Sequence, residues 1–123
     1  TIRVGAGLPT RPSVLFACHP QVIMEKPKLD IFSSPHAAKL LGVLPKAAVV
    51  FGVATDYCVR LAALGLRRRG YKVTVVSGAI AGVDPAGTRK ALADMRRAGV
   101  RFMTTGRLIR TLSGTSDIIR SWW

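Results

Sequence analysis

The segment Gly52–Val59, with the sequence GVATDYCV, places a cysteine between an apolar run and an amphipathic run. Residues 47–51 predict a buried strand, and residues 57–69 predict a helix closed by Gly70. Cys58 would then lie in the first turn of a helix, where backbone N–H groups and the helix dipole favour thiolate over thiol. The same N–H groups could hold the oxyanion of a tetrahedral intermediate. A nucleophile and a buried packing cysteine both fit this position.

Further patterns predict the parallel sheet that would position this segment. Residues 71–76 (YKVTVV) are rich in β-branched side chains and predict a second strand, and residues 100–104 predict a third. Between them, Asp84 and Pro85 indicate the start of a helix that ends near Gly99. Strands that alternate with helices over short connections imply right-handed crossovers. We therefore expect the α/β class, with three α/β/α layers and a mostly parallel sheet.

The first third of the chain shows weaker patterns. Residues 1–12 contain two glycines and two prolines, and they predict a loop or arm. Residues 13–18 form a short apolar run, and residues 22–26 predict a short strand. Residues 36–41 (HAAKLL) predict a short helix.

Length and composition are those of one compact domain. The 123 residues are 49% hydrophobic, which is enough for a hydrophobic core and argues against an intrinsically disordered chain. No apolar run approaches the roughly 18 residues needed to cross a bilayer, so no membrane partner is expected. Cys18 and Cys58 alone do not make a disulfide framework, and a reduced, cytoplasmic setting is expected. We expect residues 1–123 to form a single domain.

The net charge of +13 raises the question of a nucleic-acid partner. Most of the excess is arginine, and a basic surface can bind anionic partners. Aromatic residues make up only 7% of the chain and are not interleaved with the basic runs, although single-strand binding needs stacking platforms. We therefore expect a solvated, arginine-rich exterior, and nucleic acid is not an expected partner.

The stretch GVATDYCVRLAALGL, with RRGYKVTVVSGAIAGVD after it, resembles the isochorismatase-like cysteine hydrolase family. Nicotinamidase-related amidases are the members that it resembles most. Their pattern is Gly-Val-x-Thr-[Asp/Glu]-x-Cys-Val, an alanine-rich helix, Gly-[Tyr/Phe]-x-Val, Ala-x-Ala-Gly and a late Ala-Gly-Val-Arg-[Phe/Leu] strand. That last motif is residues 98–102 here, and the resemblance covers residues 20–106. It implies an isochorismatase-like, Rossmann-like fold that is truncated at the N-terminus.

The resemblance also implies roles for particular residues. Cys58 would attack the carbon of a small amide, ammonia would leave, and water would hydrolyse the thioester. Backbone N–H groups of Ala54 and Cys58 would form the oxyanion hole, and the Val53–Ala54 peptide bond would be cis. The segment VIMEKPKLDIF matches the family's lysine segment, which makes Lys26 the catalytic lysine and Lys28 the slipped alternative. A lysine charge there would stabilise the thiolate.

The chain departs from the family pattern in the catalytic aspartate and in the metal ligands. Family members carry a catalytic aspartate at the end of their first strand that acts as general base, and no such segment precedes Lys26. Asp30 and Asp56 occupy other family positions. Nicotinamidases also bind a divalent metal, but His19 and His36 form no cluster with ligand spacing. No metal site is expected from this chain, and the cysteine chemistry requires no cofactor.

The leading prediction is therefore an amidohydrolase of the nicotinamidase/isochorismatase type. It would act on a small amide through Cys58 and Lys26, and we expect it to form a homo-oligomer. The alternative is a catalytically incomplete remnant that acts as a binding or assembly module.

Overall fold

The computed structural model describes residues 2–4, 16, 17, 19, 21–112 and 119–121. Within it the chain divides into two compact units, residues 1–44 and residues 45–123.

Among its described residues, the smaller unit contains a two-stranded parallel sheet and short helices. Strand β1 (Ile2–Val4) pairs in parallel with strand β2 (Val22–Met24). The one-turn 3-10 helix η1 (Ile31–Ser33) and the helix α2 (Ala37–Gly42) follow. Leu40 of α2 is buried, and the partly buried side chains of Phe16, Val22 and Met24 pack against it. The predicted strand over residues 22–26 and the predicted helix over 36–41 are thus confirmed, each within about two residues.

The loop predicted for residues 1–12 is wrong at Ile2–Val4, which form β1. This strand has three residues, and its partner β2 lies far along the chain, so local sequence patterns cannot detect the pairing. Residues 5–12 lie outside the described part. Of the apolar run 13–18, the structure describes Phe16 and Ala17, which are helical.

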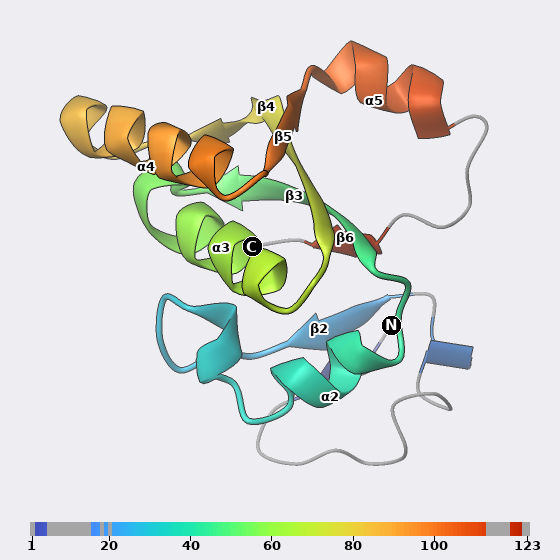
Figure 1. The fold of residues 1–123 in the computed structure, drawn as a ribbon. Helices are drawn as coiled ribbons and strands as arrows, with labels where there is room; N and C mark the ends of the chain where they lie inside the picture. Colours follow the sequence, from blue (N-terminus) through green and yellow to red (C-terminus); the bar gives the residue numbers. More distant parts are fainter. Residues whose placement is uncertain (1, 5–15, 18, 20, 113–118, 122–123) are drawn as a thin grey trace. The chain divides into compact units, whose positions relative to one another are not determined.

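The larger unit is built on a four-stranded sheet of order β5-β4-β3-β6 (Figure 1). Its elements are β3 (Ala47–Val53), η2 (Thr55–Val59), α3 (Arg60–Arg68), β4 (Lys72–Ala81), α4 (Pro85–Arg97), β5 (Arg101–Met103), α5 (Thr105–Leu112) and β6 (Ile119–Ser121). All strand pairs formed by the described residues of this sheet are parallel. Neighbouring parallel strands need crossover connections, which α3 and α4 supply.

Local signals in the sequence account for where α3 ends and for where α4 begins and ends. Asp84 caps α4, because its carboxylate accepts a hydrogen bond from the Gly87 N–H at 2.7 Å, and Pro85 is the first helical residue. Gly70 and Gly99 follow the two helices with φ of +83° and +89°, a conformation that favours glycine. The predicted C-terminal ends of both helices and the predicted start of α4 are therefore confirmed.

Helices lie on both faces of the sheet. Phe102 of β5 faces α4, because the guanidinium of Arg96 lies 4.8 Å from its ring centroid. Side chains alternate along a strand, so Arg101 and Met103 face the opposite side, where α5 packs against β4. The fully buried residues of this unit include Val50, Val59, Leu66, Tyr71, Val75, Val76 and Met95. This is the α/β class with three layers that the sequence predicts, whereas α5 and β6 were not anticipated.

Candidate active site

The carboxyl end of β3 has an irregular backbone. Its register with β4 shifts between Val50 and Gly52. Gly52 has φ of +126°, a region in which an L side chain is strained. The peptide bond between Val53 and Ala54 is cis. This irregular strand end sets the position from which the turn carrying Cys58 begins.

Cys58 lies in a π-type turn, and the prediction of a regular α-helix from residue 57 is wrong at this point. The carbonyl of Ala54 accepts hydrogen bonds from the N–H groups of Tyr57 and Val59, both at 3.1 Å. The bond to Val59 closes a turn one residue wider than an α-helical turn, and such turns recur at functional sites. Regular α-helix starts only at Arg60. Hydrophobic periodicity does not distinguish a π turn from an α turn, since both place Val59 in the core.

Cys58 itself is half-buried. Val59 beside it is fully buried, whereas the neighbouring Tyr57 is 47% exposed. The thiol therefore lies between the core and the surface. The turn η2 also brings Ala54 and Cys58 together, since the Ala54 carbonyl bonds to the residues on either side of Cys58.

Asp56 ties this turn to the start of α4. Its Oδ1 accepts the Val83 N–H and its Oδ2 accepts the Asp84 N–H, each at 3.0 Å. The hydrogen bond from Val83 is the largest influence on the pKa of Asp56, and together with the bond from Asp84 it outweighs partial desolvation and holds that pKa below its ordinary value. A carboxylate with a lowered pKa and two occupied oxygens is a weaker base.

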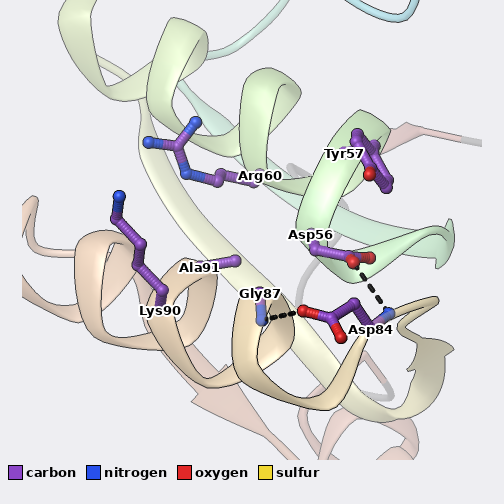
Figure 2. A pocket seen from close by; sticks show the side chains of 7 residues that line it. All are labelled: Asp56, Tyr57, Arg60, Asp84, Gly87, Lys90 and Ala91. Carbon is purple, nitrogen blue, oxygen red and sulfur yellow. Dashed lines mark hydrogen bonds between the residues drawn. The ribbon is translucent and has the colours of Figure 1, made fainter.

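A small cavity of about 260 Å³ opens next to this turn, between η2, α3 and α4. Figure 2 shows Asp56 and Asp84 at one end of it and Arg60 and Lys90 at the other. The Arg60 guanidinium also forms an ion pair of 3.0 Å with Asp94. The lining residues are Asp56, Tyr57, Arg60, Asp84, Gly87, Lys90 and Ala91. Sequence reasoning missed Arg60 and Lys90, because only the packing of α3 against α4 brings them to one cavity.

Lys26 lies in the loop after β2, in the smaller unit. Its Nζ donates hydrogen bonds to the carbonyls of Lys28 at 3.1 Å and Leu29 at 2.9 Å, so its own loop orients the ammonium. Lys28 is exposed. Asp30 caps η1, because its Oδ1 accepts the Phe32 N–H at 2.9 Å. The structure thus brings Ala54 and Cys58 together, and it places Lys26 in the other unit.

The histidines do not assemble a metal centre in the part of the chain that the structure describes. No group of three or more His, Cys, Asp or Glu side chains gathers among these residues. His36 precedes α2, and its buried Nε2 has no hydrogen-bond partner. His19 is half-buried, and Cys18 lies outside the described residues. The described donor set therefore does not fit a divalent metal.

None of the helices in the described ranges is long and apolar enough to cross a membrane.

The family model for the isochorismatase domain matches residues 14–107. The chain belongs to the isochorismatase family. A nicotinamidase of Escherichia coli (strain K12) is 38% identical over 58 residues, which are 46% of this chain and 27% of that enzyme. A pyrazinamidase of Pyrococcus horikoshii, solved in complex with zinc, is 30% identical with a TM-score of 0.58, covering 68% of this chain and 50% of its own.

A third similar structure is the Pseudomonas aeruginosa protein YcaC, solved with hexane-2,5-diol and covalent acrylamide. It is 28% identical with a TM-score of 0.58, and the match covers 74% of this chain and 46% of that chain. This isochorismatase-family chain therefore spans about half the length, or less, of the relatives that it matches.

Proposed function

We propose that this chain is a cysteine hydrolase that cleaves the C–N bond of a small amide through a thioester on Cys58. The observation that carries the proposal is the position of a half-buried cysteine in η2, directly after β3, within an isochorismatase-family domain. The similar proteins include a nicotinamidase and a pyrazinamidase, whose names indicate small aromatic amides as the substrate class. The covalent acrylamide in a third relative is consistent with a reactive nucleophile there.

In the proposed reaction, Cys58 Sγ forms a bond to the amide carbon, and the carbonyl oxygen becomes an oxyanion. The N–H groups of Ala54 and Cys58 are proposed to stabilise that oxyanion. The C–N bond then breaks, and the nitrogen leaves as ammonia after receiving the thiol proton. Water attacks the thioester, the C–S bond breaks, and a carboxylic acid and the free thiol are released.

Two further roles in the reaction, charge stabilisation and general base, have different support. Lys26 is proposed to stabilise the developing negative charge, which is supported by the resemblance of its segment to the family's lysine segment and by its oriented Nζ. The general base is not assigned. Asp30 and Asp56 are the first candidates to consider, but both carboxylates accept backbone hydrogen bonds.

Those two occupied carboxylates favour a second candidate function, a catalytically incomplete binding or assembly module. In either case we propose a homo-oligomer in the cytoplasm, with a small-molecule amide as the ligand. Neither candidate uses a metal held by the described residues.

The test is ammonia release from nicotinamide, pyrazinamide and aliphatic amides, measured for the unaltered chain and for Cys58→Ala. Release that disappears in Cys58→Ala and persists in the matched Cys18→Ala variant is the expected result. Mass spectrometry of Cys58→Ala and of the unaltered chain after brief reaction should show an acyl adduct only where Cys58 is present. A folded chain that releases no ammonia and forms no adduct would favour the incomplete module.

A further inference from the structure

A larger cavity, of about 630 Å³, lies at the amino end of the sheet in the larger unit. Its walls are the first residues of β3 and β4, parts of β5 and α5, and the ends of α3 and α4. Cys58 follows the carboxyl end of β3, whereas this cavity lies at the amino ends of the same parallel strands. The lining residues are Ala47, Ala48, Val49, Arg67, Lys72, Val73, Thr74, Gly99, Arg101, Met103, Leu108 and Thr111.

The charged residues that line the cavity are all cations, namely Arg67, Lys72 and Arg101. The acids described in the larger unit are engaged elsewhere. Asp56 and Asp84 accept backbone N–H groups, and Asp94 pairs with Arg60 and Arg97. No carboxylate therefore neutralises the cavity from within the described part of this unit.

Arg67 is held in a fixed orientation at the edge of the cavity. Its Nε donates to the Ala98 carbonyl at 2.8 Å, and its Nη1 donates to the Tyr71 carbonyl at 3.0 Å. The guanidinium lies against Gly99, where a Cβ atom would approach Nη2 to 2.8 Å. A planar donor that is already oriented loses little entropy when it binds an anion.

Sheet register places the other two cations on one face. Thr74 pairs with Arg101 across β4 and β5, and Lys72 lies two residues before Thr74, so all three side chains point to the same side. Lys72 and Arg101 are both exposed. The hydroxyls of Thr74 and Thr111 add polar groups to the same wall.

The remaining wall, as the described residues of the larger unit form it, is apolar. Val49, Met103 and Leu108 line the cavity, and α5 has no buried residue. The volume lies within the range of roughly 300–1,000 Å³ that is typical of small-molecule pockets. An apolar wall next to cations suits a ligand with an apolar body and one anionic end.

We propose that this cavity binds a small amphipathic carboxylate of the medium-chain fatty acid class. The carboxylate contacts Lys72 and Arg101, Arg67 adds positive charge from the neighbouring ends of α3 and α4, and the alkyl chain lies over Val49 and Leu108. A second copy of this chain is a poor occupant, because its own net charge of +13 repels a cationic wall. The proposal is independent of the chemistry at Cys58.

The test is isothermal titration of the full chain with decanoate, with decanol as the uncharged probe. Saturable one-to-one binding of decanoate is expected. Lys72→Gln and Arg101→Gln should each weaken it about tenfold, because each removes a hydrogen bond to a charged group. Arg89→Gln, which removes one charge from the exposed surface of α4, is the matched control and should bind like the unaltered chain.

Three results with decanoate, decanol and the charge variants would overturn the proposal, and a fourth comes from Cys58→Ala. They are the absence of saturable binding by chains that circular dichroism shows to be folded, equal affinity for decanol, or a loss in Arg89→Gln as large as in Arg101→Gln. Cys58→Ala should bind decanoate normally. Loss of binding in that variant would place the ligand at the hydrolase site and would also overturn the proposal. A chain that binds decanoate but hydrolyses no amide would contradict the proposed function and leave the proposed binding site intact.

Discussion

The carboxylates of Asp56 and Asp84 each accept a backbone N–H group, and these two hydrogen bonds join η2 to α4. Oδ2 of Asp56 accepts the N–H of Asp84 at 3.0 Å, and the Asp84 carboxylate accepts the N–H of Gly87 (Figure 2). The turn that carries Cys58 is thus fastened to the first turn of α4. Asp56 accordingly serves as a structural group.

The first prediction concerns acid stability. The pKa of Asp56 is lowered in the folded chain, so its contribution to stability is complete above the ordinary aspartate pKa of about 3.9 and is lost as pH falls through the folded value. Asp94 behaves likewise, because its hydrogen bond from Arg60 lowers its pKa. Asp56→Asn should be less stable at pH 7 and should lose less stability on acidification. Urea unfolding between pH 3 and pH 7 measures the free energy of unfolding of both chains. If that free energy falls with pH equally in Asp56→Asn and in the unaltered chain, the Asp56 carboxylate does not have this stabilising role.

The second prediction separates backbone strain from crowding at two glycines. Gly70 and Gly99 have similar positive φ, which costs an L residue roughly 1–2 kcal/mol. A Cβ at Gly70 would meet nothing within 4 Å, whereas at Gly99 it would press on Arg67. Gly70→Ala should therefore lose about that amount in free energy of unfolding, and Gly99→Ala should lose more.

Gly42→Ala is the control for this pair, because Gly42 has neither a positive φ nor a neighbour within 4 Å of its Cβ position. It should leave the midpoint of thermal unfolding unchanged or slightly raised. Equal losses in Gly70→Ala and Gly99→Ala would mean that Arg67 moves away freely.

The third prediction tests the core beneath α3. Leu66 is fully buried, and Leu66→Ala should lower the free energy of unfolding by about 2–5 kcal/mol. Leu64 lies on the same helix and is only half-buried, so Leu64→Ala should cost less. Chemical denaturation of both variants compares them, and a larger loss in Leu64→Ala would be inconsistent with the observed face of α3.

The fourth prediction separates Lys26 from Lys28 and depends on the proposed hydrolase activity. Lys26→Gln should lower amide hydrolysis on the order of a hundredfold, the cost of losing one charge-stabilising donor. Lys28→Gln should retain activity, because the Lys28 side chain is exposed and only its backbone contacts Lys26 and Ser33. Equal losses of amide hydrolysis in the two variants would contradict the assignment of the catalytic role to Lys26 alone.

Elements with strong local signals could be predicted from the sequence. The Asp84–Pro85 pair and the glycines at 70 and 99 set the ends of α4 and α3, and both act within one turn of the helix. Strand β1 and strand β6 could not be predicted, because their short pairings depend on partners far along the chain.

The candidate site likewise has features that adjacent residues predict and features that depend on tertiary structure. The place of Cys58 after β3 follows from adjacent residues, whereas the π turn depends on one hydrogen bond between Ala54 and Val59 that periodicity does not encode. The tie from Asp56 to Val83 requires the tertiary packing of η2 against α4. The grouping of Lys72 with Arg101 likewise requires the register of β4 and β5.

The position of β6 has a consequence for the order of folding. It pairs with only Ala48, Val49 and Val50 of β3, and the two strands come from opposite ends of the larger unit. Closing the longest loop in the unit for three residue pairs is entropically the least favourable step, so we expect β6 to join last and to exchange its amide hydrogens first. Whenever it detaches, β3 becomes an edge strand of the sheet that the described residues of the larger unit form. The kinetics of this one terminal strand would then govern how readily partly unfolded copies of the chain associate.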